Sequence, residues 1–198
     1  MRPTVLILSL SLSLVAGRAR PPLSDHPPVS KAEAPALPVV DMNACPFEGC
    51  TFRKWTVIRK SPLYTSWKRD RRQIGVLAKG QVVTGITGVH ITKQPDVIHV
   101  FQAIPELGLK PGDVVLRYMY LGEGFANIWA NGRYIKSFDC TFVTEKGEGG
   151  CLRDCRAVVE ENGEKEWWVE VKMSSGKIGW TKAEYNFNGM DALASTSF

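Results

Sequence analysis

Apolar and polar side chains alternate along residues 167–180 with the period of a β-strand. Valine and methionine occupy every second position from 169 to 173, with glutamate and lysine between them, so this strand is expected to bury one face. Ser174-Ser175-Gly176 supplies a glycine that tolerates positive φ where the chain reverses. Ile178 and Trp180 then put apolar side chains on one face of the returning strand. The pattern predicts a hairpin that closes a β-sheet.

Other stretches also have strand character, and none shows an extended helical period. They are rich in β-branched and aromatic residues and lie at 52–64, 82–92, 114–122 and 125–134. Gly85 and Gly88 interrupt one of them, which indicates a bulge or a strong bend. Asn131-Gly132 is a two-residue hairpin signal because both residues tolerate positive φ. The chain is therefore predicted to be all-β, with a loop or one short turn at 105–109.

A short internal repeat organises these strands. Residues 109–115 repeat residues 77–83 at an offset of 32 residues. The repeat predicts two opening halves and two closing halves, at 57–92, 97–122, 125–142 and 166–182. Together they make two small barrels, and the chain order favours nesting of a unit at 97–142 inside a unit built from 55–92 and 160–185. One barrel with an elaborated insertion is the alternative.

The first residues have the pattern of an export signal. Arg2 is followed by an apolar run at 4–15, and small residues at 16, 17 and 19 offer a cleavage site. The run is shorter than the roughly 20 residues that a membrane-spanning helix needs. Residues 1–19 are therefore predicted to be a signal peptide. The mature protein is expected to be periplasmic or secreted, without a transmembrane segment.

Composition changes after this segment. Residues 20–40 are rich in proline, alanine and serine, which predicts an extended tether before a folded region at 41–198. Removing the four basic and two acidic residues before Asp41 lowers the formal net charge from +5 to +3. The dense basic cluster at 68–72 is interpreted as a solvated loop, with attraction to an anionic wall polymer as the alternative. No nucleic-acid partner is expected for an exported chain of this mild charge.

All five cysteines lie in the predicted folded region. Export makes disulfides the expected chemistry, and an odd number leaves at least one cysteine unpaired or joined to another chain. The spacing of Cys45 with Cys50 and of Cys151 with Cys155 permits local bridges that leave Cys140 over, and bridges between the two pairs are equally permitted. The spacings differ from those of a zinc site, so no metal or cofactor is expected.

Two motifs carry a resemblance to a known family. The hairpin at 168–180 reads W-x-x-V, a glycine turn and G-W, and residues 74–83 read hydrophobic-G-x-L-x-x-G-x-x-V. Both resemble the bacterial SH3-like (SH3b) domain, and the resemblance extends in short pieces over most of 54–182. It implies a non-catalytic binding module that recognises a cell-wall peptide or glycan, or an envelope protein.

Aromatic residues are the predicted ligand site. The resemblance places Tyr64 and Trp67 in the long loop after the first strand, while Trp168 and Tyr185 belong to the closing hairpin and the segment after it. Rings flanked by lysine and arginine suit an extended peptide or a glycan, because they offer a large contact area at low entropy cost. Trp167 and Trp180 are interpreted as core residues, which is also the alternative for the other rings.

Alternative functions rest on the cysteines. Asp139-Cys140-Thr141 is similar to the start of NlpC-type cell-wall peptidases, and the sequence at 150–153 resembles the core of L,D-transpeptidases. The first family needs a histidine base downstream of its cysteine, whereas all three histidines here precede Cys140. The second family places a histidine just before its Gly-Cys, whereas the nearest histidine here is about fifty residues from Cys151. His90 and His99 are expected at solvent-facing positions of a hairpin around 91–98. A structural accessory domain, disulfide-linked to a partner, is the third alternative, and no catalytic residue is assigned.

Overall fold

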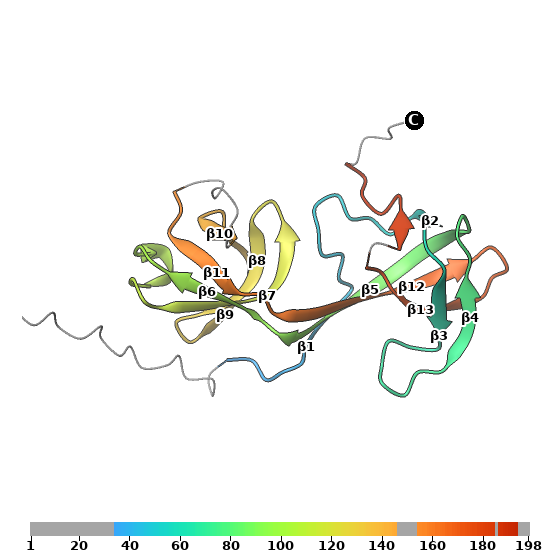
Figure 1. Ribbon diagram of the computed structural model, residues 1–198, viewed down its shortest axis with the longest axis horizontal. Coiled ribbons are helices and arrows are strands. Elements are labelled where there is room, and N and C mark those ends of the chain that lie inside the picture. The colour runs from blue at the N-terminus through green and yellow to red at the C-terminus, as the bar shows by residue number, and fades with distance from the viewer. Residues whose placement is uncertain (1–33, 146–153, 185, 194–198) are drawn as a thin grey trace, which may run out of the picture.

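Two strongly curled half-barrel sheets make up the protein (Figure 1). The computed structural model describes residues 34–145, 154–184 and 186–193. The predicted signal peptide, most of the tether, Cys151 and Tyr185 lie outside these residues. No α-helix occurs in the described part of the chain, where one short 3-10 turn, η1 (Pro105–Leu107), is the sole helical element. The all-β prediction is confirmed.

The first sheet joins both ends of the described chain. Its strand order is β14-β2-β5-β12-β13-β3-β4, and β1 pairs with β5 beside this path. The strands are β1 (Val39–Met42), β2 (Lys54–Val57), β3 (Ser61–Tyr64), β4 (Gln73–Leu77), β5 (Val82–Gln94), β12 (Glu164–Met173), β13 (Ile178–Lys182) and β14 (Phe187–Asn188).

The second sheet comes from the middle of the chain, in the order β10-β11-β6-β7-β8-β9. The strands are β6 (Asp96–Val100), β7 (Val114–Gly122), β8 (Phe125–Ala130), β9 (Arg133–Asp139), β10 (Val143–Glu145) and β11 (Ala157–Glu161). Neighbours run antiparallel except for β10 and β11, which are parallel.

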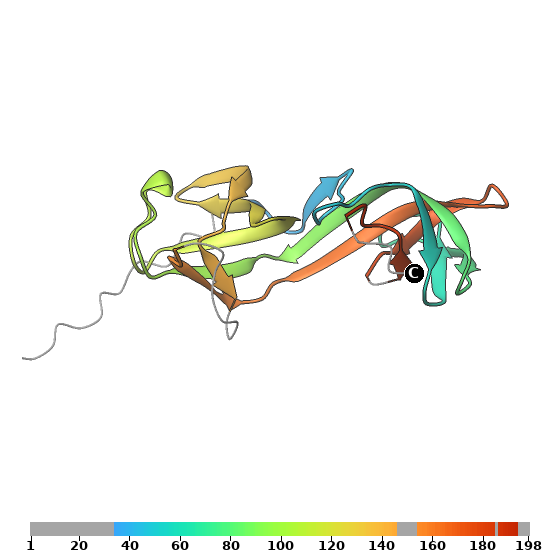
Figure 2. The same ribbon diagram turned by 90° about the horizontal axis from the view of Figure 1, so that it is seen from above.

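Two strand pairs carry the chain from one sheet to the other (Figure 2). β5 runs through Pro95 into β6, and β11 returns through residues 162–163 into β12. Within the first sheet β5 pairs with β12, and within the second β6 pairs with β11. The second sheet is thus inserted between two neighbouring strands of the first, as in the nested order. The expected hairpin around 91–98 is wrong, because this segment continues from one sheet to the next.

Each sheet encloses its own apolar core. The first core contains Trp55, Val57 and Leu63, all fully buried, and the second contains Ile98, Ile104 and Ile128, also fully buried. A further small cluster of Val89, Ile91 and Trp168 lies on the other face of the β5–β12 pair. Separate cores make each sheet a packing unit in its own right.

The two copies of the internal repeat adopt the same local structure. In one copy Gly80 has a φ of 82° and donates to the carbonyl of Val57 over 2.7 Å; in the other Gly112 has a φ of 96° and donates to the carbonyl of Val100 over 2.8 Å. Each turn feeds a long strand, β5 or β7. The predicted Asn131-Gly132 hairpin also forms, with φ of 46° and 70°.

Candidate functional site

Three of the four predicted ligand aromatics lie together. Trp168, on β12, packs on Val89 and Ile91, and Tyr64 and Trp67 pack against the same cluster from the end of β3 and the loop that follows it. The Tyr64 and Trp168 rings meet edge to face, with their centroids 5.9 Å apart. We call Tyr64, Trp67 and Trp168 the aromatic cluster. The fourth predicted residue, Tyr185, lies outside the described residues.

Trp168 is the floor of this cluster and not an open platform. Only 1% of the residue is exposed. The guanidinium of Arg71 lies 4.6 Å from the centre of its ring and 5.4 Å from that of Tyr64, and the Lys182 ammonium lies 5.7 Å from the Trp168 ring. Such cation–π contacts strengthen as water is excluded from them. Arg71 therefore caps the cluster and holds the β3–β4 loop over β12.

Glu166 holds the polar side of the cluster. Its carboxylate accepts hydrogen bonds from Trp168 Nε1 over 2.9 Å, from Lys182 Nζ over 2.8 Å and from Lys93 Nζ over 2.9 Å. Burial alone would raise the pKa of Glu166, but these bonds outweigh it and lower the pKa to about 2. Glu166 is thus a fixed anion that draws one lysine to each side of Trp168.

Two open grooves flank Arg71. The Tyr64 groove encloses about 430 Å³, and the charged and aromatic residues that line it include Arg59, Lys60, Tyr64, Arg71, Lys182 and Glu184. The Trp67 groove encloses about 480 Å³ between the β3–β4 loop and β1, and its lining includes Val40, Trp67, Lys68, Arg69, Arg71 and Lys93. Arg71 borders both grooves, so it lies at their common wall.

Sequence reasoning missed the cationic part of this site. The basic cluster at 68–72 was interpreted as a solvated loop, whereas Arg71 is partly buried against two rings and Lys68 lies 5.8 Å from the Trp67 ring. Lys93 and Lys182 come from strands distant in sequence. The signal in the sequence was the interleaving of Tyr64, Trp67 and the basic loop, but nothing local shows which ring the loop covers.

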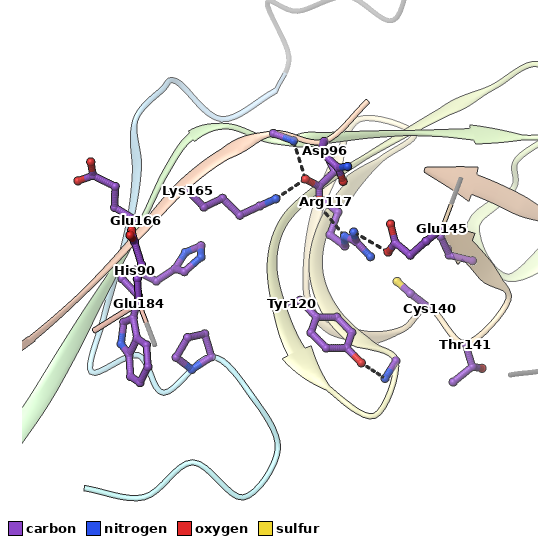
Figure 3. A pocket seen from close by; sticks show the side chains of 16 residues that line it. His90, Asp96, Arg117, Tyr120, Cys140, Thr141, Glu145, Lys165, Glu166 and Glu184 are labelled. Carbon is purple, nitrogen blue, oxygen red and sulfur yellow. Dashed lines mark hydrogen bonds and ion pairs between the residues drawn. The ribbon is translucent and has the colours of Figure 1, made fainter. Parts of the chain in front are cut away.

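A second cavity, of about 790 Å³, lies at the junction of the two sheets (Figure 3). Asp96 lines it and accepts hydrogen bonds from Arg117 Nε over 2.6 Å, from the amide of Gly163 over 2.7 Å and from Lys165 Nζ. Burial opposes ionisation of Asp96, yet these donors lower its pKa. Arg117 Nη2 also donates to Glu145 over 3.0 Å. The charges of Asp96, Glu145, Arg117 and Lys165 thus neutralise one another.

Of the two histidines predicted to face solvent, only His99 does so. His90 lines the junction cavity and is 5% exposed, so its predicted solvent-facing position is wrong; His99 is exposed as predicted. Burial, with a smaller contribution from the nearby Lys165, lowers the pKa of His90 to about 4. His90 is therefore a neutral imidazole at pH 7.

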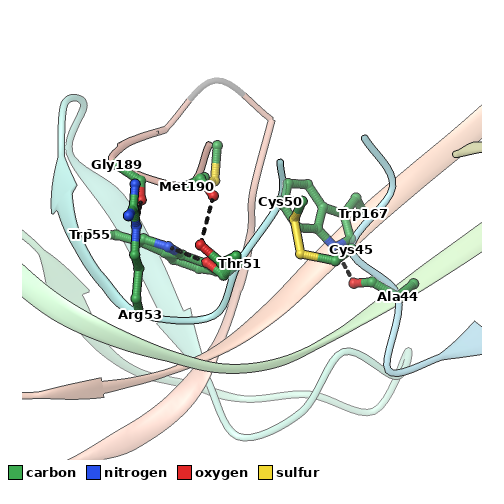
Figure 4. The surroundings of a disulfide bond; sticks show 9 residues. All are labelled: Ala44, Cys45, Cys50, Thr51, Arg53, Trp55, Trp167, Gly189 and Met190. Carbon is green, nitrogen blue, oxygen red and sulfur yellow. Dashed lines mark hydrogen bonds between the residues drawn. A yellow bond between two sulfur atoms is a disulfide. The ribbon is translucent and has the colours of Figure 1, made fainter. Parts of the chain in front are cut away.

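The first disulfide closes a short segment of the N-terminal loop beside the first sheet (Figure 4). Cys45 and Cys50 are bonded to each other, which confirms this local pairing. Within the same loop the carbonyl of Ala44 accepts a hydrogen bond from Trp167 Nε1 over 3.1 Å, and Phe47 meets the Trp167 ring edge to face. Trp167 is thus partly buried by the loop, as expected for a core-facing residue.

Neither Cys140 nor Cys155, the other two cysteines among the described residues, has the features of a catalytic thiol. Cys155 is disulfide-bonded, and Cys151 lies outside the described residues. Cys140 is free but 5% exposed, and burial raises the pKa of its thiol to about 12. A catalytic cysteine needs a thiolate, and a bridge to a partner chain needs an accessible sulfur. Cys140 offers neither.

The described residues offer neither a cluster of metal ligands nor a membrane-spanning helix. Among the described residues no group of three or more His, Cys, Asp and Glu side chains is placed to hold a metal ion. In that part of the chain there is also no helix of the length and hydropathy needed to cross a membrane. The protein matches no family model, no curated protein and no solved structure.

Proposed function

We propose that this protein is an exported, non-catalytic binding protein built from two nested SH3-like barrels. Its ligand is a cell-wall peptide or another envelope component, held beside the aromatic cluster. The observation that carries the proposal is Arg71, stacked on Trp168 and Tyr64 between two open grooves. Rings and a guanidinium at the edge of a groove suit the recognition of an extended chain.

The strand order supports the SH3-like part of the proposal. β2, β5, β12 and β13 are neighbours in that order, and β14 returns to pair with β2. The β3–β4 hairpin departs between β2 and β5, where SH3-like barrels carry their long binding loop. In the second sheet β6, β7, β8 and β9 follow the same order and β11 pairs with β6. The Cys45–Cys50 disulfide and the apolar run at 4–15 support export.

A pull-down on insoluble peptidoglycan tests this proposal with the oxidised mature chain. The parent is expected in the pellet. Trp67→Ala and Arg71→Gln are each expected to lower affinity about tenfold, since interface aromatics and arginines commonly carry more than 1.4 kcal/mol of binding energy. Trp67 is partly buried, so its loss disturbs the fold less than that of Trp168.

His99→Gln is the control, because His99 is an exposed residue of the second sheet. Near-UV circular dichroism of each variant shows whether the aromatic packing is intact. Equal binding by the parent and both site variants would exclude the aromatic cluster as the ligand site. A parent that stays in the supernatant would exclude peptidoglycan as the ligand.

A further inference from the structure

Positive charge is concentrated around the two grooves. The Tyr64 groove is lined by four basic residues and one carboxylate: Arg59, Lys60, Arg71, Lys182 and Glu184. The Trp67 groove adds three basic residues and one carboxylate: Lys68, Arg69, Lys93 and Glu166. This excess of five positive charges is larger than the formal net charge of +3 of residues 41–198. The surface around Arg71 is therefore the place where an anionic ligand is drawn to the protein.

Arg71 has hydrogen-bonding capacity to spare at the centre of this surface. Its Nη1 donates to the carbonyl of Lys68 over 2.9 Å, and no carboxylate of the described residues forms an ion pair with it. An arginine has five N–H donors in a plane that matches a carboxylate in two-point fashion. Since its contacts with the Tyr64 and Trp168 rings and with the Lys68 carbonyl restrain the guanidinium, Arg71 is preorganised to receive a carboxylate from either groove.

Glu166 places a carboxylate between the two grooves, where it binds a lysine from each of them. Lys93, from the Trp67 groove, and Lys182, from the Tyr64 groove, both donate to its Oε1 atom. One internal anion thus already joins cations of both grooves. The two grooves form one electrostatic unit on either side of Trp168.

We propose that both grooves together bind one extended acidic peptide, whose carboxylates engage the Tyr64 groove, Arg71 and the Trp67 groove in turn. The inference rests on the proposed function, since it names the ligand class of the same site. A peptide fits better than a glycan because sugars stack on open aromatic faces. Here Arg71 covers Trp168, and Lys68 lies over Trp67.

Titration of fluorescein-labelled decaglutamate into the oxidised full chain, followed by fluorescence anisotropy at low salt, tests the inference. Lys60→Gln weakens the Tyr64 groove and Arg69→Gln the Trp67 groove; both residues are exposed. Each is expected to raise the Kd about five- to tenfold, and Arg71→Gln at least tenfold, as for charge-assisted hydrogen bonds. The double variant Lys60→Gln/Arg69→Gln is expected to lose more affinity than either single one.

Lys110→Gln is the matched control, because it removes one exposed lysine from the second sheet, away from both grooves. It is expected to change the Kd less than twofold. An equal loss in Lys110→Gln would mean that binding follows net charge only and would overturn the inference. An effect confined to Lys60→Gln or to Arg69→Gln would overturn the joining of the grooves.

Dextran sulfate serves as the competing glycan. If it binds more tightly than decaglutamate and its affinity falls in the same three variants, the ligand class is a glycan and the peptide is excluded. Binding to peptidoglycan without binding to decaglutamate would overturn the inference and leave the proposed function standing. Binding to decaglutamate without binding to peptidoglycan would overturn the wall ligand and support the acidic-peptide site.

Discussion

At the scale of single residues, the charged side chains Asp96, Arg117 and Lys165 pair with one another at the junction between the sheets, and His90 is not part of this pairing. Asp96 is matched by Arg117 and Lys165, whereas the buried Nδ1 atom of His90 has no hydrogen-bond partner among the described residues. Asp41 on β1 lies opposite His90 in the sheet, and burial raises the pKa of its carboxyl. Neither group gains from ionising here, so the neutral imidazole is the form that the fold selects.

Folding stability is therefore expected to depend on His90 in mild acid. Its pKa is about 4 in the folded protein and 6.5 in the unfolded chain, so between these values the unfolded chain binds the extra proton. The contribution is intact above pH 6.5, falls as pH drops and is fully lost below pH 4, at a cost of about 3 kcal/mol. Urea unfolding of the parent and His90→Gln from pH 7.5 to 4.5 measures it.

In His90→Gln this part of the pH dependence is expected to disappear, and in the exposed control His99→Gln it is expected to persist. A parent whose free energy of unfolding is flat between pH 7.5 and 4.5 would contradict the buried neutral imidazole.

At the scale of elements, β5 is irregular at Gly85, where the ring of Trp55 packs closely against the strand. The register between β5 and β12 shifts at the pairing of Gly85 with Val171, which confirms the predicted irregularity. A Cβ atom at Gly85 would lie 2.6 Å from the ring of Trp55, a fully buried residue of the first core. The missing side chain is thus a packing requirement of β2 on β5.

Gly85→Ala is expected to lower the free energy of unfolding by about 1–3 kcal/mol, the usual cost of overpacking a core. Gly75→Ala in β4 is the matched control, because its Cβ would meet its nearest atoms at 3.9 Å. At an ordinary φ this change is expected to be neutral or to stabilise by about 0.4–1 kcal/mol. Equal stability of the two variants in thermal unfolding would show that Trp55 does not require the gap at Gly85.

At the scale of the whole molecule, the second sheet is a complete insertion into a hairpin of the first. β5 and β12 stay paired up to Gln94 opposite Glu164, where they diverge into β6 and β11. The cores do not merge, since the apolar cluster of the second sheet contains no residue of the first. Contacts across the junction are polar, such as the hydrogen bond from Thr92 Oγ1 to the carbonyl of Tyr118 over 2.7 Å.

Replacing residues 95–163 by Asn-Gly is expected to give a shorter chain that still folds, because the turn closes β5 on β12 as an ordinary hairpin. Cooperative urea unfolding should persist, with an m-value roughly two-fifths lower, as less surface is buried. The decaglutamate site should be kept, since every residue of both grooves lies outside the deleted segment. Loss of cooperative unfolding would show that the first sheet depends on the second.

The sequence by itself determined the local features of this protein. The strand at 169–173, the Asn131-Gly132 turn and the repeated glycine turn each depend on neighbouring residues, and all of them formed. On the returning strand Ile178 departs from this pattern, because it pairs with Lys172 on the face away from Val169 and Val171 and is exposed. The nested order of the two sheets followed from the repeat. The aromatic cluster was found in part for the same reason, because Tyr64 and Trp67 are close in the chain.

The tertiary structure decided which residues that are far apart in the sequence contact one another. The sequence predicts a hairpin around 91–98, whereas the course of this segment is set by its pairing with β11 and β12, about seventy residues later. His90 is buried at a cavity to which both sheets and the N-terminal loop contribute, and Arg71 is a cap because Trp168 lies beneath it. Burial and charge pairing are sums over all neighbours in space, and the sequence order alone does not contain them.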